Sequence, residues 1–129
     1  DRQGANPLND VKQVVDGKDI VMMQAETDNL HMDDAIIEYI TMLSFATRQN
    51  PLIELGVSPR GSIALAGMSK AKAYISGRTY VTPEDVQSIF KDVAGHRIIL
   101  NPRAKISSVT IDEVIDNIFR TVPVPRAMR

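Results

Sequence analysis

Apolar residues recur every three or four positions along most of this chain, a spacing typical of amphipathic helices. The clearest example covers residues 33–49, where the first aspartate can cap the free N–H groups of the opening turn and Pro51 follows the end. Before it, the sequence predicts a short turn over residues 9–15, a break at residues 17–19 and a short helix through residues 21–25.

Three later helices are predicted from their caps. In each, a hydroxyl side chain stands where it can accept a hydrogen bond from the first turn. In two of them proline follows at the first helical position, where its missing N–H costs nothing. The three openings are Ser58-Pro59, Thr82-Pro83 and the capping box from Thr110 to Glu113. The three ends are predicted at Gly77, Gly95 and Pro123.

Helices of this length joined by short loops predict one all-α domain over residues 1–129, a helical bundle around a single apolar core. Residues 50–57 and 101–108 are expected to be loops. Two extended pieces, at residues 29–32 and 79–81, could pair as one short two-stranded β pair beside the bundle.

Composition narrows the range of partners. Hydrophobic residues make up 43% and charged residues 24% of the chain, as in ordinary globular proteins. A net charge of -1 gives no general attraction to nucleic acid, and no apolar run is long enough to cross a membrane. The chain has no cysteine, and Asp1-Arg2-Gln3-Gly4 lacks the apolar centre of a signal peptide. We therefore expect a cytoplasmic protein with no nucleic-acid partner and no membrane insertion.

The charge is divided unevenly along the chain. Residues 1–47 carry nine acids and three bases (-6), whereas residues 48–129 carry seven acids and twelve bases (+5). In the basic half, Arg60 falls in the first turn of a predicted helix, where the helix dipole disfavours a cation. A phosphate would offset this cost, and Gly61 would let such a ligand approach the backbone. A solvated or salt-bridged arginine is the alternative.

Two further motifs come close to nucleotide chemistry and fail. The run Gly56–Gly61 resembles a phosphate loop, but Ser62 stands where that loop requires lysine. Asp112 and Glu113 follow an apolar run, as magnesium-binding acids do in such ATPases, but the capping box already explains Glu113. We therefore predict no phosphate loop and no magnesium site in this chain.

The remaining polar candidates have structural explanations. The acid pairs lie at helix starts, where the dipole favours negative charge; they are Asp33-Asp34 and Glu84-Asp85. Other side chains lack the second ligand or the base that metal binding or nucleophilic catalysis requires; they are His31, His96, Ser62 and Ser69. The sequence therefore predicts no metal ligands and no catalytic triad.

Five separated segments follow one another in the order of a known family and together extend over nearly the whole chain. They are Ala46-Thr47-Arg48, Leu55-Gly56-Val57-Ser58-Pro59-Arg60, Gly77-Arg78-x-Tyr80-Val81-x-Pro83-Glu84-Asp85-Val86, His96-Arg97-Ile98 and Val122-Pro-Val-Pro125. In this combination the chain resembles the C-terminal lid domain of MoxR-type AAA+ ATPases. It departs from the family at Val57, where alanine is usual, and at Gly61.

The resemblance implies a helical lid that closes on a nucleotide bound by an α/β domain preceding residue 1. It also implies that Arg60 is the sensor 2 arginine, the candidate catalytic residue that reaches the terminal phosphates. Ser58, Pro59 and Gly61 would then line the nucleotide with it. ATP and Mg²⁺ are implied for the full-length protein, whereas this part alone is expected to bind no cofactor and to hydrolyse no ATP.

The same resemblance implies partners. They are ATP or ADP, the neighbouring subunits of a homo-oligomeric ring, expected to be a hexamer, and client complexes matured by a chaperone-like activity, often with von Willebrand factor A domain proteins. Arg48, Arg78 and Arg97 are interpreted as mainly structural, with contacts to nucleotide or a neighbouring subunit left open. The Val122–Pro125 tail is either a loose end or a contact with a neighbour.

Two alternatives need no nucleotide. One is a self-contained helical interaction module whose basic half binds an acidic protein surface. The other is a DNA-binding helix pair formed by residues 58–76 and 82–94, which is disfavoured because Glu84 and Asp85 at the start of the second helix would repel phosphates. Nucleotide affinity that depends on Arg60 would distinguish the lid from both.

Overall fold

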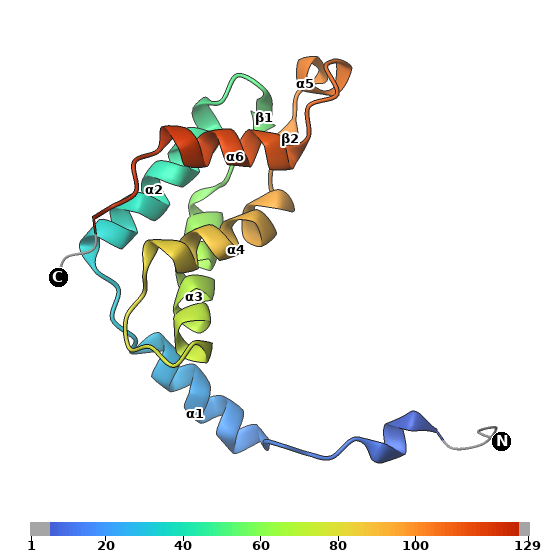
Figure 1. Ribbon diagram of the computed structural model, residues 1–129, viewed down its shortest axis with the longest axis vertical. Helices are drawn as coiled ribbons and strands as arrows, with labels where there is room; N and C mark the ends of the chain where they lie inside the picture. Colours follow the sequence, from blue (N-terminus) through green and yellow to red (C-terminus); the bar gives the residue numbers. More distant parts are fainter. Residues whose placement is uncertain (1–5, 127–129) are drawn as a thin grey trace.

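A computed structural model describes residues 6–126, which form a predominantly helical fold (Figure 1). The elements in chain order are η1 (Pro7–Asp10), α1 (Gly17–Asp28), α2 (Asp34–Gln49), β1 (Ile53–Leu55), α3 (Pro59–Ile75), α4 (Pro83–Gly95), β2 (Ile99–Leu100), α5 (Pro102–Ile106) and α6 (Ile111–Thr121). The predicted all-α class is thus confirmed. The residues Asp1-Arg2-Gln3-Gly4, on which the signal-peptide argument rests, lie outside the described part.

The core lies where α2, α3, α4 and α6 meet (Figure 1). Helices α2, α4 and α6 turn apolar stripes inward, as the helical spacing predicts, whereas α3 packs through the small or apolar residues Gly61, Leu65, Ser69 and Ala73. The rings of Phe90 and Phe119 pack with centroids 5.5 Å apart and planes tilted by 60°, a favoured aromatic geometry. The largest fully buried apolar side chains are Tyr39, Leu43, Leu65, Phe90, Ile115 and Ile118.

Most of the predicted caps are present. The exception is Thr82 at α4, whose hydroxyl accepts nothing from the first turn and instead donates to the Asp85 carboxylate. The Asp33 carboxylate accepts a hydrogen bond from the Ala35 N–H at 2.8 Å and opens α2. The capping box predicted between Thr110 and Glu113 opens α6. Gly77 ends α3 with φ of 72°, a left-handed conformation that residues with a Cβ rarely adopt. Because these signals act within one turn, the sequence alone placed the long helices correctly.

The β structure differs in part from the prediction. Residues 29–32 and 79–81 do approach each other, through a single parallel bridge between His31 and Tyr80. The two-stranded sheet lies elsewhere: β1 pairs antiparallel with β2, which joins the segment before α3 to the segment after α4. The prediction that residues 50–57 form only a loop was therefore wrong.

Two further corrections concern short elements. Residues 101–108 were expected to be a loop, but the Asn101 side chain accepts from the Ala104 N–H at 3.0 Å and opens α5, which buries Ala104. The turn predicted over residues 9–15 is displaced toward the N-terminus, because Pro7 opens η1 and residues 11–16 are irregular. Helix α1 begins at Gly17 behind Asp16, so the predicted break is the helix start.

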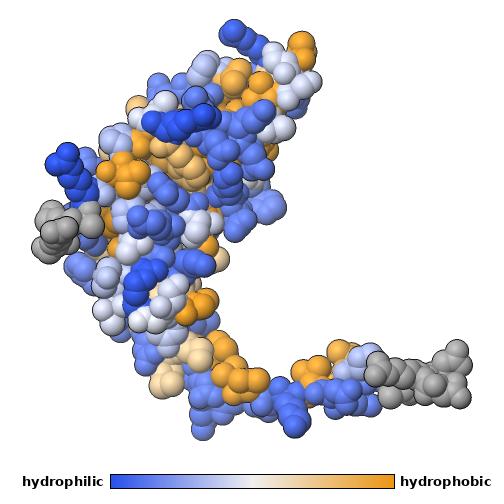
Figure 2. All heavy atoms as spheres, viewed as in Figure 1, coloured by the Kyte–Doolittle hydropathy of each residue, from blue (hydrophilic) through white to orange (hydrophobic). Residues whose placement is uncertain are grey.

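Helix α1 and the segment before it lie at the edge of the fold. The segment projects away from the helices in Figure 1, and α1 contributes no buried residue. Figure 2 shows apolar side chains in the open along this part of the chain. They include Leu8, Val11, Val14, Ile20 and Val21. The four-helix core therefore forms without them.

Replacement of Phe90 by alanine tests the position of the core. The ring is fully buried, so Phe90→Ala should lower the free energy of unfolding by about 3–5 kcal/mol through lost burial and the cavity left behind. Ile63→Ala, at a side chain that is 74% exposed, is the control and should change it by less than about 0.5 kcal/mol. Chemical denaturation measures both, and equal effects would contradict this core.

Candidate functional site

The first turn of α3 carries the four predicted site residues. Ser58 caps the helix, and its Oγ accepts a hydrogen bond from the Gly61 N–H at 3.2 Å. Pro59 occupies the first helical position and has no N–H to offer. The Ser62 N–H bonds to the Ser58 carbonyl at 3.0 Å and continues the helix. This part of the prediction, a capped helix start with Arg60 in its first turn, is confirmed.

Arg60 is exposed at this helix end. Within residues 6–126 its guanidinium forms no ion pair, and its backbone N–H has no hydrogen-bond partner. The salt-bridged alternative is therefore not what the described residues show. Both groups lie at the positive pole of the α3 dipole, so negative charge is favoured here. The turn can contact an anion through one N–H and one guanidinium.

A buried hydroxyl fixes the chain that leads into this turn. The Val57 N–H donates to Oγ1 of Thr47 at 2.8 Å, and the same hydroxyl donates to the Ser44 carbonyl at 2.6 Å. The Ser62 hydroxyl donates to the Ser44 hydroxyl at 2.8 Å. Thr47 and Ser44 are both fully buried. Helix α2 therefore holds the start of α3 through side-chain hydroxyls, which the sequence analysis did not identify.

Both glycines of the apparent phosphate loop have packing roles. A Cβ on Gly56 would lie 2.7 Å from Oγ1 of Thr47, so only glycine lets this segment approach α2 so closely. A Cβ on Gly61 would lie 2.7 Å from Cγ1 of Val57 and 3.2 Å from Cδ of Arg97. The expectation that Gly61 leaves room for a ligand is therefore corrected, since Val57 and Arg97 fill that room.

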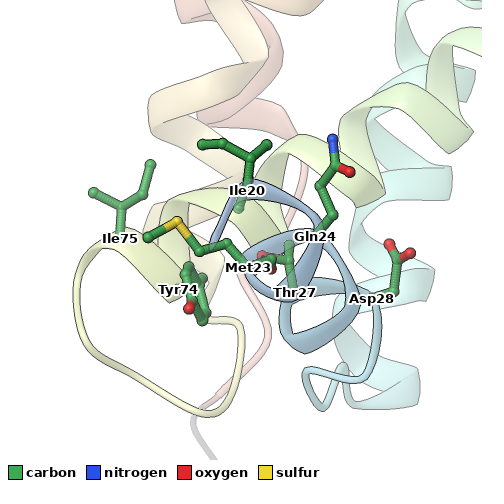
Figure 3. A pocket seen from close by; sticks show the side chains of 8 residues that line it. Ile20, Met23, Gln24, Thr27, Asp28, Tyr74 and Ile75 are labelled. Atoms are coloured by element: carbon green, nitrogen blue, oxygen red, sulfur yellow. The ribbon is translucent and has the colours of Figure 1, made fainter. Parts of the chain in front are cut away.

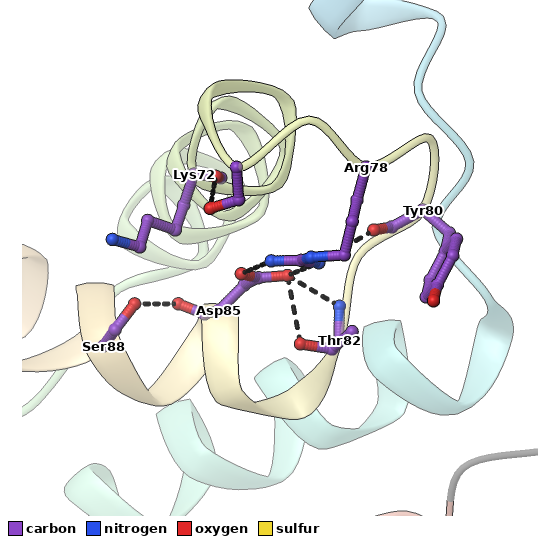
Figure 4. A network of polar contacts seen from close by, with 7 residues as sticks. Lys72, Arg78, Tyr80, Thr82, Asp85 and Ser88 are labelled. Atoms are coloured by element: carbon purple, nitrogen blue, oxygen red, sulfur yellow. Dashed lines mark hydrogen bonds and ion pairs between the residues drawn. The ribbon is translucent and has the colours of Figure 1, made fainter.

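Arg78 and Asp85 form a bidentate ion pair with nitrogen to oxygen distances of 2.6 and 2.5 Å (Figure 4). The carboxylate also accepts from the N–H and the hydroxyl of Thr82, which completes the cap of α4. Burial alone raises the pKa of Asp85, but the hydrogen bonds from Arg78 and Thr82 outweigh it and hold that pKa below its usual value. Arg78 is thus a structural residue that ties the α3–α4 loop to α4.

The other two arginines of the matched segments lie at the C-terminal ends of α2 and α4. Arg48 is exposed in the last turn of α2, where a cation complements the helix dipole. Arg97 follows α4 and donates from Nη1 to the Val93 carbonyl at 2.8 Å. Its aliphatic part lies over Gly61. Arg97 and Arg60 are 37 positions apart in the sequence, and the fold brings Arg97 onto the turn that carries Arg60.

The remaining candidates have structural roles or no partners for chemistry. The Ser69 hydroxyl is buried and donates to the Leu65 carbonyl of its own helix at 2.8 Å. His31 takes part in the β bridge through its backbone, and His96 ends α4. Across the described positions no group of three potential metal ligands occurs. No helix between residues 6 and 126 has the length and apolar character needed to cross a bilayer.

Val122, the first residue of the C-terminal tail, packs against the core of its own domain. Its side chain is buried against the core, and its N–H bonds to the Ile118 carbonyl at 2.9 Å as α6 ends. The start of the Val122–Pro125 segment therefore packs within its own domain, and residues 123–126 follow without regular structure.

A cavity of about 490 Å³ lies between α1 and α3 (Figure 3). Its walls are mostly apolar, and its polar groups include the Tyr74 hydroxyl, which donates to Glu26. The lining residues are Ile20, Met23, Gln24, Thr27, Asp28, Ala71, Tyr74 and Ile75. It lies at the C-terminal end of α3, about 20 Å along the helix from Arg60, so it is separate from the predicted site.

The family model described as the AAA lid domain matches residues 45–118, which run from the C-terminal part of α2 into the core helix α6. The chain belongs to the AAA lid domain family. The lid domain is also 28% identical over 97% of its length to "Chaperone MoxR1" of Mycobacterium tuberculosis, covering 35% of that protein. The predicted resemblance to MoxR-type proteins is thus confirmed.

Two further comparisons cover most of the lid domain. It is 36% identical over 96% of its length to the uncharacterized protein YeaC of Bacillus subtilis, covering 39% of that protein. The crystal structure of a "putative ATPase" from Cytophaga hutchinsonii superposes on 90% of the lid domain with a TM-score of 0.84 and 30% identity. The lid domain spans less than two fifths of each of these proteins.

Thr47→Val tests the buried hydroxyl of the lid domain. Valine keeps the shape but leaves the Val57 N–H buried without a partner, so the free energy of unfolding should fall by about 1–3 kcal/mol. The control is Thr41→Val on the same helix, where the exposed hydroxyl bonds only to its own helix and water can replace it. Chemical denaturation compares them, and an equal loss for both would contradict the assignment.

The Asp85 ion pair predicts a pH dependence. Because the pKa of Asp85 is lower in the folded than in the unfolded state, its stabilisation is complete above the unfolded value of about 3.9 and is lost as pH falls through the folded value. Asp85→Asn should therefore cost about 1.5–3 kcal/mol at pH 7 and progressively less in acid. Unfolding curves at several pH values measure the difference.

The matched control for this ion pair is Asp116→Asn. Asp116 pairs with Lys91 at 2.9 Å on the surface, with both side chains more than 40% exposed, so its loss should destabilise the fold far less than the loss of Asp85. A difference between wild type and Asp85→Asn that stays constant down to strongly acidic pH would show that the carboxylate charge is not the stabilising feature.

Proposed function

We propose that this lid domain closes on ATP bound elsewhere in a longer MoxR-type AAA+ ATPase and contacts the terminal phosphates through Arg60, its sensor 2 arginine. The observation that supports this role is the exposed, unpaired guanidinium at the positive end of α3, within residues 6–126. We infer that the ligand is a nucleotide from the membership of the AAA lid domain family and the similarity to MoxR1. We propose the cytoplasm as its compartment, in keeping with the absence of cysteine from this part of the protein.

Each predicted site residue has a part in this proposal. Ser58 and Pro59 fix the start of the helix and thereby the direction in which Arg60 leaves it. Arg60 supplies the charge that stabilises the terminal phosphates during hydrolysis. Gly61 acts through packing rather than by touching the nucleotide. The described residues do not fit Mg²⁺, because no acidic cluster is present among them, so the metal would be held by another part of the protein.

The wider role follows from the same family. In the full-length protein, closure of the lid would couple nucleotide state to the neighbouring subunits of a homo-oligomeric ring such as a hexamer. A relative is named as a chaperone, which supports a chaperone-like role in the maturation of partner complexes. Von Willebrand factor A domain proteins are the partners that we propose to test first.

Arg60→Ala in the full-length protein tests the proposal. Loss of a charge-stabilising donor should lower the rate of ATP turnover by at least about ten-fold while the fold is retained. Steady-state ATPase assays and binding of labelled ADP and ATP measure this. Arg103→Ala is the control, since Arg103 is also exposed but lies on α5, and turnover should be unchanged.

Unchanged turnover and unchanged nucleotide affinity in Arg60→Ala would overturn the sensor role. The domain would then be a helical interaction module attached to its neighbour, as in the alternative considered from the sequence. Binding of an acidic protein surface, lost on replacement of basic residues other than Arg60, would support that alternative.

A further inference from the structure

Arg97 joins the end of one core helix to the start of another. Its Nη1 donates to the Val93 carbonyl in the last turn of α4 at 2.8 Å. Its Cδ lies 3.2 Å, and its Nε 3.6 Å, from the place that a Cβ on Gly61 would occupy. One side chain therefore bonds to α4 with its head and packs on the first turn of α3 with its stem.

The first turn of α3 is held from two sides. Helix α2 contacts it through the Thr47 hydroxyl, which binds the Val57 N–H, and through the bond between Ser62 and Ser44. On the side of α4, the Arg97 stem covers the bare backbone of Gly61. A Cβ at Gly61 would collide with Val57 and lie only 3.2 Å from Cδ of Arg97, so the bare backbone lets the arginine stem lie close to this turn.

We propose that Arg97 is a positioning residue that sets the place and direction of Arg60. By anchoring its guanidinium on Val93, Arg97 holds its stem against the turn that carries Arg60, one residue before Gly61. This inference rests on the proposed function, because its consequence is seen in ATP turnover. It assigns to Arg97 no contact with the nucleotide.

Three substitutions separate the head of Arg97 from its stem. Arg97→Met keeps a stem of similar length over Gly61 and removes the donor to Val93. Arg97→Lys keeps the stem and leaves a cation that can still donate to the carbonyl. Arg97→Ala removes both. If anchoring is the role, turnover should fall about three- to ten-fold in Arg97→Met, fall further in Arg97→Ala and be largely restored in Arg97→Lys.

A double-mutant cycle in the full-length protein distinguishes positioning from general stability. If Arg97 acts through Arg60, Arg97→Met should lower the turnover number in the wild-type background and leave it unchanged in the Arg60→Ala background. Thermal unfolding of every variant is followed in parallel. Arg78→Met is the comparator, because it removes a structural ion pair, and its effect should be the same in both backgrounds.

Each outcome decides the matter. Arg97→Met with normal turnover, or with a loss that is equally large in the Arg60→Ala background, overturns the inference while leaving the role of Arg60 intact. A fall in turnover in Arg97→Met that disappears in the Arg60→Ala background supports the inference. Unchanged turnover in Arg60→Ala itself overturns the proposed function, and this inference with it. The failure of the two proposals can therefore be distinguished, because the outcomes in Arg97→Met bear only on the inference.

Discussion

The place of the candidate site depends on one buried hydroxyl. Oγ1 of Thr47 accepts from the Val57 N–H and donates to the Ser44 carbonyl, and water does not reach it. A buried N–H without a partner is costly, so the chain between β1 and α3 has one favourable position against α2. Gly56 makes that position accessible by letting the backbone approach the helix. The direction of α3, and of everything packed on it, follows.

The two ends of α3 are held very differently. At its start, the Thr47 hydroxyl of α2 holds the Val57 N–H, and the Arg97 stem lies over Gly61. At its far end, α1 lies against the helix with no buried residue, tied by Lys70 to the Asp28 carbonyl and by Tyr74 to Glu26. The turn that carries Arg60 is thus held by side chains of α2 and of the segment after α4, whereas α1 adds only surface contacts at the other end of the helix.

The helices could be predicted because their signals are local, whereas the tertiary contacts of the site could not. Asp33, Ser58 and the Thr110 capping box act within one turn, so the sequence contains the whole interaction. The β1–β2 pair joins residues more than forty positions apart through very short strands, which leave little periodic signal. Gly61 was interpreted as room for a ligand because the chain does not reveal that Arg97 folds over it.

The way α3 begins limits how tightly its tip can hold an anion. Proline supplies no N–H at the first position, and the Ser58 hydroxyl already occupies the N–H of Gly61, which leaves that of Arg60 as the open backbone donor of this turn in the described structure. Phosphate cradles use several such donors at once. A tip with one open backbone donor and one cation offers an anion few contacts, so we expect it to bind phosphate weakly unless another part of the protein holds the nucleotide.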